Sequence, residues 1–265
     1  MADTTCVWFA ECRPATVEHM NTTPNVALVT GGNKGIGLHI VRQLAERGVH
    51  VYLGARDPAR GRAAATKLAE SGLDVEFLHL DVTDQAVVAA AAHYVDQTDG
   101  HLDILINNAA ITSGMDPASK VTTQDLRRTF ETNLFGVATV TNQFLPLLKR
   151  STSPRVVNVS SAMGSIALIA DPQIEITKLN EAAYQISKAA LNALTVLYAN
   201  ELRPDGVKVN AVCPGYRATE LNGGQPTPGA GNPADGATVA VTMALIANDG
   251  PTGQFTGDTG EQYPW

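Results

Sequence analysis

Residues 29–37 read VTGGNKGIG, with glycine at four of the nine positions and a lysine between them. The apolar run NVALVT (25–30) is typical of a buried strand, and GIGLHIVRQLAERG (35–48) has the period of an amphipathic helix. Glycines let a backbone approach a ligand closely, and the first turn of a helix offers N–H groups to an anion. The spacing is G-x-x-x-G-x-G rather than the commoner G-x-G-x-x-G dinucleotide pattern. The stretch therefore favours a nucleotide site over its plain alternative, a tight strand–helix turn without a ligand.

Strand and helix patterns keep alternating beyond this turn. Further strands are predicted at 49–54, 74–81, 102–107, 155–160, 207–212 and 253–256, and helices at 58–71, 84–98, 122–150, 180–202 and 233–247. The strands are continuous Val/Ile/Leu runs, which indicates a parallel sheet covered by helices on both faces. We therefore expect one doubly wound α/β domain over residues 23–265, built on a seven-stranded parallel sheet.

Two segments stand outside this alternation. Residues 1–22 lack the basic start and long apolar core of a signal peptide, and we interpret them as a disordered N-terminal tail. Residues 222–235, NGGQPTPGAGNPAD, are rich in glycine and proline and follow the carboxyl end of a strand, where ligands bind in such sheets. The loop 214–235 is therefore either a surface connection or a lid over the site.

Composition argues against several classes of protein. Lys plus Arg is 19 and Asp plus Glu is 26, so the net charge is -7. An acidic chain without a basic cluster is a poor partner for nucleic acid or for an anionic membrane surface. The longest apolar runs are strand-sized and far too short to cross a bilayer. The three cysteines have no C-x-x-C spacing, so we expect a cytoplasmic protein in a reducing compartment, without a metal site.

Four further motifs lie at strand ends or on helices. NNAA (107–110) and NVSSAMG (158–164) each follow a strand, and Asn133 interrupts a long helix although asparagine is a poor helix former. Tyr184 and Lys188 in YQISK are one helical turn apart, on one face. Each motif has an ordinary interpretation as a strand cap, a loop or a surface pair. Their occurrence in this order on one fold makes four independent coincidences a poor explanation.

Together these motifs resemble the short-chain dehydrogenase/reductase family, from Val26 to the C-terminus. The motifs that carry the resemblance are TGGNKGIG, NNAA, Asn133, VSS, Y-x-x-x-K at 184–188 and CPGYRAT at 213–219. GGNKGIG and ARDPARG are most similar to the carbonyl reductase branch. Two departures are Ala110, where the family usually has glycine, and a gap between Ser161 and Tyr184 that exceeds the commonest family spacing. The resemblance implies a Rossmann-type fold.

It also implies the chemistry, which is the reduction of a ketone or aldehyde by an NADP-dependent oxidoreductase acting on the CH–OH group. The hydride must come from a cofactor, because no side chain donates one. Tyr184 would be the general acid/base, and the Lys188 ammonium with the positive nicotinamide ring should lower its pKa from about 10. Ser161, which matches the family position better than Ser160, would orient the substrate oxygen. Asn133 would support a water chain that supplies protons.

Cofactor contacts follow from the same motifs. The predicted cofactor-binding residues are Gly31, Asn33, Lys34, Gly35, Ile36, Gly37, Arg56, Asp81, Val82, Asn108, Ala109, Tyr184, Lys188, Pro214, Gly215 and Thr219. Asp81 would contact adenine, or else cap a helix or turn. Ala55 stands where an NAD enzyme usually has an acid, and the neighbouring Arg56 suits a 2′-phosphate, with Lys34 as a second cation. The sequence therefore predicts NADPH, unless both cations are merely solvated.

Alternatives remain for activity, substrate and assembly. A non-catalytic NADP-binding regulator would lack the Tyr/Lys pair, an epimerase would carry a longer C-terminal domain, and a methyltransferase would need an acid after the second strand. A neutral small carbonyl compound is the expected substrate, with a carrier-linked or polyketide-type ketone as the alternative; Arg217 is the one candidate clamp for a charged group. Residues 168–181 are expected either to cover a helix pairing face, which favours a monomer or homodimer over a tetramer, or to form a longer substrate-side loop.

Overall fold

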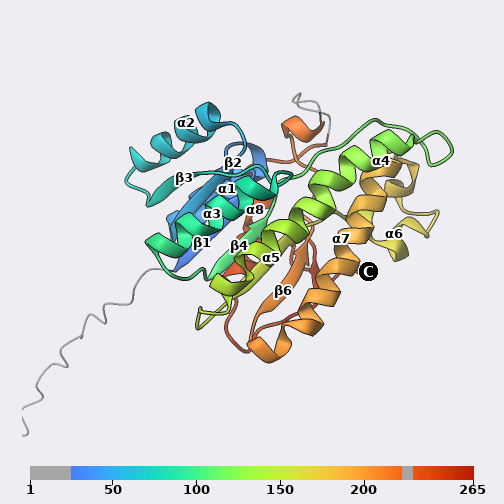
Figure 1. Cartoon of the computed structure of the whole chain (residues 1–265). Helices are drawn as coiled ribbons and strands as arrows, with labels where there is room; N and C mark the ends of the chain where they lie inside the picture. The colour runs from blue at the N-terminus through green and yellow to red at the C-terminus, as the bar shows by residue number, and fades with distance from the viewer. Residues whose placement is uncertain (1–24, 223–228) are drawn as a thin grey trace, which may run out of the picture.

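The computed structural model describes residues 25–222 and 229–265, and these contain a seven-stranded parallel sheet of order β3-β2-β1-β4-β5-β6-β7 (Figure 1). The strands are β1 (Val26–Thr30), β2 (His50–Ala55), β3 (Val75–His79), β4 (Ile104–Asn107), β5 (Arg155–Val159), β6 (Lys208–Val212) and β7 (Phe255–Thr256). The predicted sheet is confirmed. The proposed tail lies outside the described residues, as does part of the predicted lid.

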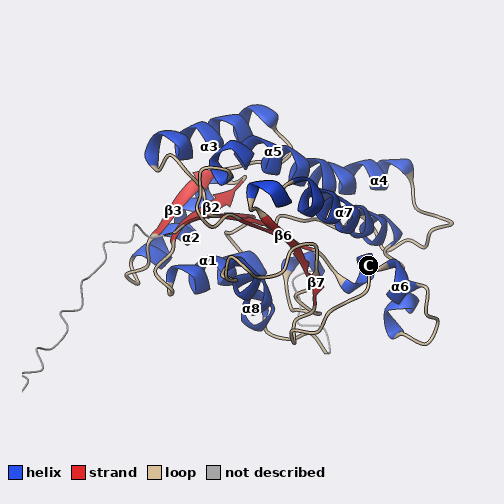
Figure 2. Ribbon diagram, turned by 90° about the horizontal axis from the view of Figure 1, so that it is seen from below, coloured by secondary structure: helices blue, strands red, loops and turns tan. Residues whose placement is uncertain are grey.

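Helices cover both faces of the sheet (Figure 2). The main helices are α1 (Gly35–Ala45), α2 (Pro58–Ala69), α3 (Gln85–Thr98), α4 (Thr123–Phe130), α5 (Val137–Leu148), α7 (Ala182–Glu201) and α8 (Pro233–Ala244). Buried side chains of α1, α2 and α8 belong to one core cluster, and those of α3, α5 and α7 belong to the other. Successive strand residues alternate between them: Ala27 and Val29 join the first cluster, while Val26 and Leu28 join the second. This explains the continuous apolar strands of the sequence.

Strand order reverses at β1, which pairs with β2 on one side and with β4 on the other. Open α/β sheets bind ligands at such a switch point, outside the carboxyl ends of the strands. The glycine turn of residues 31–37 lies there, between β1 and α1. The fold therefore presents this turn as the floor of a ligand site.

The predicted helix at 122–150 is not one regular helix. It consists of α4, a π-helical turn η1 (Glu131–Gly136) and α5. Asn133 lies in the π turn with its side chain fully buried and hydrogen-bonded to the backbone of Ile111. A π turn inserts an extra residue into a helix and is common at functional sites. The helix pattern of the sequence was right, and the irregularity comes from these tertiary contacts.

Residues 162–178 contain short elements that the sequence did not predict. They are the 3-10 turn η2 (Ala162–Gly164), helix α6 (Ile166–Ile169) and the 3-10 turn η3 (Glu175–Lys178). The N–H of Ala167 donates to the carbonyl of Trp265 at 3.0 Å, and Ser165 Oγ donates to the carbonyl of Pro264 at 2.7 Å. Figure 1 shows α6 beside α7 and near the C-terminus. Whether residues 168–181 shield a helix pairing face or form a substrate-side loop stays a prediction.

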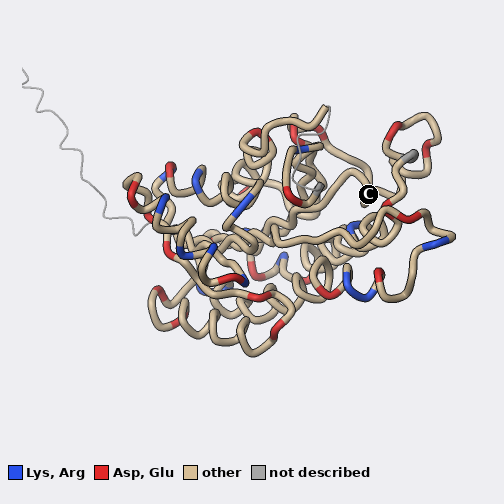
Figure 3. Tube along the Cα trace, turned by 90° about the horizontal axis from the view of Figure 1, so that it is seen from above, with Lys and Arg blue, Asp and Glu red and all other residues tan. Residues whose placement is uncertain are grey.

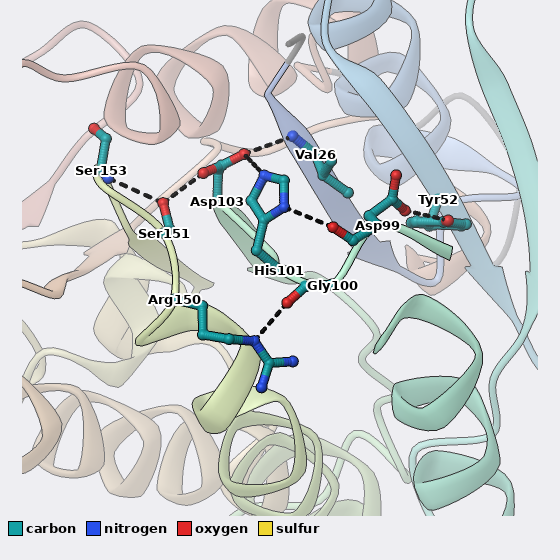
Figure 4. Close-up of polar contacts among 9 residues, drawn as sticks. All are labelled: Val26, Tyr52, Asp99, Gly100, His101, Asp103, Arg150, Ser151 and Ser153. Atoms are coloured by element: carbon teal, nitrogen blue, oxygen red, sulfur yellow. Dashed lines mark hydrogen bonds and ion pairs between the residues drawn. The ribbon is translucent and has the colours of Figure 1, made fainter. Parts of the chain in front are cut away.

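A polar network closes the opposite edge of the sheet, at the amino ends of β1 and β4 (Figure 4). The buried Asp103 carboxylate accepts from the N–H of Val26 at 2.8 Å and from Ser151 Oγ, and His101 Nε2 lies 3.2 Å from it. Tyr52 Oη donates to the Asp99 carboxylate at 2.5 Å. These contacts fix the sheet at the edge away from the glycine turn.

Charged residues of both signs are interspersed along the described chain (Figure 3). None of the helices in residues 25–222 and 229–265 combines the length and the apolarity that spanning a bilayer requires.

Candidate functional site

A groove runs across the carboxyl ends of the strands around the switch point. Its wall consists of Gly31 and residues 33–37 after β1, Arg56 after β2, 80–83 around the end of β3, 108–112 after β4, Thr132 in η1, and 219–221 after β6. Gly35 has φ +52°, a left-handed conformation that favours glycine. A Cβ at Gly37 would lie 2.5 Å from Asn108 Nδ2, so only glycine allows α1 to begin this close to the strand ends.

Lys34 is the N-cap residue of α1 and lies in the groove wall. Its Nζ lies 2.5 Å from the carboxylate of Glu220, another residue of the groove wall, which belongs to the segment after β6. The hydrogen bond with Lys34 and the positive charge of Lys34 lower the pKa of Glu220, and the charge of Arg60 adds to this. The lysine predicted to bind phosphate is thus already paired with a carboxylate. Arg56 is exposed on the groove wall, as predicted.

The β3 and β4 sides of the groove carry the other predicted nucleotide contacts. Asp81 lines the groove, and its Oδ1 accepts from the N–H and the Oγ1 of Thr83, at 3.0 and 2.8 Å. The turn role considered for Asp81 is therefore present, and a groove position accompanies it. Asn108 Nδ2 donates to the carbonyls of Thr30 and Gly31, at 2.9 and 3.2 Å. This side chain holds the glycine turn in place, so the part it presents to the groove is limited.

Hydrogen bonds connect the β4 side of the groove to α7. Asn133 Oδ1 accepts from the N–H of Ile111, and its Nδ2 donates to the carbonyl of Ile111 and to Ser187 Oγ, at 2.9 to 3.0 Å. Thr112 Oγ1 lies 3.4 Å from the Glu181 carboxylate, three residues before Tyr184. Asn133 therefore connects the groove wall to the helix that carries Tyr184 and Lys188. Its predicted part in a water chain stays a prediction.

Ser161, Tyr184 and Lys188 come together where β5 ends against α7. Tyr184 is 8% exposed and Lys188 is 2% exposed, while Ser161 is half-buried. The Ser161 side chain lies near enough to the Tyr184 hydroxyl to act on its pKa, and Ser161 Oγ also accepts from the N–H of Met163 at 3.2 Å. Lys188 Nζ donates to the carbonyl of Val159 at 2.8 Å and lies 5.6 Å from the centre of the Tyr184 ring. The structure thus brings together the predicted hydroxyl, phenol and ammonium groups.

In the protein without a cofactor, burial shifts the pKa values of Tyr184 and Lys188. Burial raises the pKa of the Tyr184 phenol above its usual value, although the hydrogen bond with Ser161 acts in the opposite direction. Burial also lowers the pKa of Lys188 to about 8. Burial therefore sets the pKa of Tyr184 in the protein alone, and its lowering by Lys188 together with a bound nicotinamide ring stays a prediction. The phenol is protonated at neutral pH.

Most of the predicted cofactor-binding residues line the groove. Those in its wall are Gly31, Asn33, Lys34, Gly35, Ile36, Gly37, Arg56, Asp81, Val82, Asn108, Ala109 and Thr219. The described groove wall does not include Tyr184, Lys188, Pro214 or Gly215. For these four residues, contact with a cofactor stays a prediction.

Sequence reasoning missed several residues of the site. The groove wall also contains Leu80, Thr83, Ile111, Thr112, Thr132, Glu220 and Leu221. Glu220 directly follows the predicted Thr219, so its neighbourhood was a usable signal, but its pairing with Lys34 spans the chain and leaves no local pattern. Thr132 precedes Asn133, and Thr112 follows the NNAA motif, so both were within reach of the motifs already identified.

Arg217 does not present a free guanidinium to a substrate. Its Nε donates to the carbonyl of Pro214 at 2.6 Å, and its Nη2 is paired with the Asp258 carboxylate. Beside it, the N–H of Ala218 donates to the carbonyl of Gly231 at 3.0 Å, and the N–H of Gly231 donates to the carbonyl of Tyr216 at 2.9 Å. We refer to these contacts of residues 216–218 with Gly231 and Asp258 as the loop neck. The structure thus gives Arg217 a structural role instead of the predicted clamp.

The groove fits a dinucleotide by its own chemistry. The glycine turn leaves the first turn of α1 at the groove floor, where N–H groups and the helix dipole favour a phosphate. Arg56 and Lys34 add positive charge on the same wall, and Val82 provides an apolar surface after β3. A phosphate-bearing ligand with one flat apolar group satisfies these three features at once.

Comparison with known proteins agrees with this geometry. A family model described as short chain dehydrogenase matches residues 25–228. Carbonyl reductase [NADPH] 1 of Sus scrofa is 35% identical over 93% of this chain and 99% of its own length. Salutaridine reductase of Papaver somniferum is 34% identical over 91% of this chain and 97% of its own length.

A solved structure shows the same likeness in three dimensions. The NADPH-bound carbonyl reductase from chicken fatty liver superimposes with a TM-score of 0.81 and 27% identity, covering 91% of this chain and 99% of its own. The agreement includes the fold and relatives of the carbonyl reductase branch. The chain therefore belongs to the short-chain dehydrogenase/reductase family, and its relatives include carbonyl reductases and related plant reductases.

Proposed function

We propose that this protein is an NADPH-dependent oxidoreductase that reduces a ketone or an aldehyde to an alcohol, with Tyr184 as the general acid. The observation that carries the proposal is the meeting of Ser161 and Tyr184 at the end of β5, with the Lys188 ammonium beside the tyrosine ring. A regulator that only binds a nucleotide has no need for a buried tyrosine and a buried lysine beside a half-buried serine. Relatives named as reductases at about a third identity support the same reaction class.

The residues of the chain divide the work of a carbonyl reduction among them. Bound NADPH supplies the hydride. Tyr184 Oη donates its proton to the substrate oxygen as that oxygen becomes an alkoxide, and Ser161 Oγ hydrogen-bonds the same oxygen and orients it. The raised pKa of Tyr184 keeps the phenol protonated before the reaction. The Lys188 ammonium stabilises the phenolate that remains after proton transfer.

NADPH rather than NADH follows from charge at the adenosine end of the groove. Ala55 ends β2 where a carboxylate would repel a 2′-phosphate, and the exposed guanidinium of Arg56 comes next. The carbonyl reductases of pig and of chicken fatty liver are both named or described with NADPH. We infer that Arg56 is the main 2′-phosphate contact and Lys34 the second.

The test is a panel of neutral ketones and aldehydes assayed by the loss of NADPH absorbance, with Tyr184→Phe beside the wild type. We expect the Phe variant to bind NADPH normally and to lose about 10²–10⁴-fold in kcat, the usual contribution of a positioned proton donor. Wild-type turnover by Tyr184→Phe would contradict the assignment. Tight NADPH binding without turnover of any free carbonyl compound would instead favour a carrier-linked substrate or a non-catalytic regulator, and carrier-bound ketones would separate these two.

A further inference from the structure

We propose that Asn192 is a positioning residue, which holds the loop carrying Ser161 in register with Tyr184 and Lys188. The proposal rests on the reductase function above. Tyr184, Lys188 and Asn192 follow one another at four-residue spacing on α7, so their side chains lie along one face of the helix. Asn192 is 3% exposed and lies one turn beyond Lys188.

Both ends of the Asn192 amide are used on the same loop. Ser160 Oγ donates to Asn192 Oδ1 at 2.6 Å, and Asn192 Nδ2 donates to the carbonyl of Gly164 at 3.0 Å. Ser160 immediately precedes Ser161, and Gly164 ends the turn that follows it. Asn192 therefore holds the loop on both sides of Ser161, without contacting the Ser161 side chain itself.

The loop also lies directly on the helix at Lys188. A Cβ at Gly164 would lie 2.6 Å from the carbonyl carbon of Lys188, so the glycine backbone sets the spacing between loop and helix. Van der Waals contact of this kind fixes a distance but leaves the loop free to slide along the helix. The two hydrogen bonds of Asn192 fix the position of the loop along the helix, which the van der Waals contact leaves open.

The position of the Ser161 loop along α7 matters because proton transfer depends steeply on the geometry of the reacting groups. A displacement of about 1 Å at reacting groups can cost on the order of 10²-fold in rate. Other contacts hold the two ends of this loop, because the N–H of Ser160 donates to the carbonyl of Val212 at 2.8 Å and Ser165 Oγ donates to the carbonyl of Pro264 at 2.7 Å. Between these ends, the N–H of Ala162 donates to the Cys213 sulfur at 3.2 Å, which is a weak acceptor. Loss of Asn192 should therefore leave the loop in place but allow Ser161 to drift relative to Tyr184.

The test compares Asn192→Leu, which keeps the branching and the number of side-chain heavy atoms and removes both hydrogen bonds, with Ser160→Ala, which removes one of them. Thr195→Val is the matched control. Thr195 is fully buried on the same helix, and its Oγ1 accepts from Asn158 Nδ2 of β5 at 2.9 Å. It thus provides a buried side-chain hydrogen bond of α7 with β5, away from the Ser161 loop.

Three measurements are made on each variant. Fluorescence titration with NADPH counts the binding-competent sites, steady-state assays give kcat per such site, and hydrogen exchange follows the amides of residues 162–165. We expect Asn192→Leu to lose about 10- to 100-fold in kcat per site. Its affinity for NADPH should stay within about twofold and exchange should be faster at 162–165. Ser160→Ala should fall between it and the wild type, while Thr195→Val should melt earlier yet keep its kcat per site.

The outcomes separate this proposal from the function it rests on. If Asn192→Leu retains kcat per site within about twofold, or if Thr195→Val loses as much as Asn192→Leu, the positioning role is wrong. If the wild type reduces no carbonyl compound, the proposed function fails, and hydrogen exchange still decides whether Asn192 anchors the loop. Unchanged exchange at 162–165 in Asn192→Leu would overturn the proposal in either case.

Discussion

Replacing Glu220 by glutamine should tighten the binding of NADPH, although it removes no contact with the cofactor. Glu220 pairs with Lys34 in the groove wall, so a 2′-phosphate that arrives at Lys34 must displace a carboxylate that is already there. The lowered pKa of Glu220 means that this competitor is charged throughout the neutral range. A glutamine has nearly the same shape but no charge, and it competes far less well for an ammonium group.

The size of the effect follows from exposure. The Lys34 and Glu220 side chains are 50% and 57% exposed, so solvent screens the pair and its strength is that of a surface ion pair. Removing a competitor of this strength should lower the Kd for NADP⁺ by about two- to fivefold. The Kd for NAD⁺ should not change if Lys34 serves the 2′-phosphate. At about 1 M salt, where the screening length is ~3 Å, the difference between the variant and the wild type should shrink.

The assay is isothermal titration with NADP⁺, NAD⁺ and adenosine 2′,5′-bisphosphate, which report binding without turnover. Asp205→Asn is the control, because Asp205 forms a comparably exposed ion pair with Lys149 and its loss changes the net charge by the same amount. An equal decrease in the Kd values for NADP⁺ and NAD⁺ would indicate that Lys34 contacts the pyrophosphate, which both cofactors share, instead of the 2′-phosphate. Weaker NADP⁺ binding by Glu220→Gln would refute the competition altogether, and an equal effect of Asp205→Asn would reduce it to overall charge.

Three further predictions concern the same site and its surroundings. Arg56→Ala should raise the KM for NADPH about tenfold and leave the KM for NADH unchanged. A charged hydrogen bond contributes ~1.5–3 kcal/mol, and the solvent exposure of Arg56 favours the lower end of this range. Equal losses for both cofactors in steady-state kinetics would contradict this prediction. Burial lowers the pKa of Lys188 from 10.5 to about 8. Between these two pH values Lys188 keeps its proton in the unfolded chain but loses it in the folded chain. The free energy of unfolding of the wild type, relative to that of Lys188→Met, should therefore rise with pH across this window. Thermal unfolding without cofactor from about pH 8 to about pH 10.5 measures the difference, and a difference that falls with pH would show that the ammonium is not desolvated in this way. Light scattering at micromolar concentration should find a monomer or dimer, although Phe135, Ile186 and Leu197 are exposed on η1 and α7. A stable tetramer would exclude the proposal that residues 168–181 cover a helix pairing face.

Local periodicity was sufficient for the strands and the main helices. The run NVALVT became β1, and the pattern from residue 182 to residue 201 became α7, because burial of both sheet faces leaves a clear apolar signal in the sequence. The Tyr184–Lys188 spacing likewise survived into the structure, since a four-residue interval on a helix fixes a shared face whatever surrounds it.

Features set by distant contacts could not be predicted in this way. The π turn at Asn133 depends on the Ile111 backbone and on Ser187, and the Lys34–Glu220 pair joins residues that lie far apart in the sequence. The pKa of Tyr184 rises because of burial that only the folded chain reveals, whereas the sequence suggested the neighbouring lysine and the nicotinamide ring. A motif shows which functional groups are present, but their desolvation and their pairing with distant residues can be read only from the folded structure.

The loop neck has a consequence for how such a protein changes its specificity. Two backbone hydrogen bonds between residues 216–218 and Gly231, together with the Arg217–Asp258 ion pair, close the chain on itself before and after the intervening residues. The entropy of closing a loop grows only slowly with its length once the ends are held. The sequence between residues 222 and 230 can therefore be exchanged, lengthened or grafted from a relative while β6, α8 and the groove wall up to Leu221 keep their positions. The neck makes this stretch a replaceable module on an unchanged scaffold.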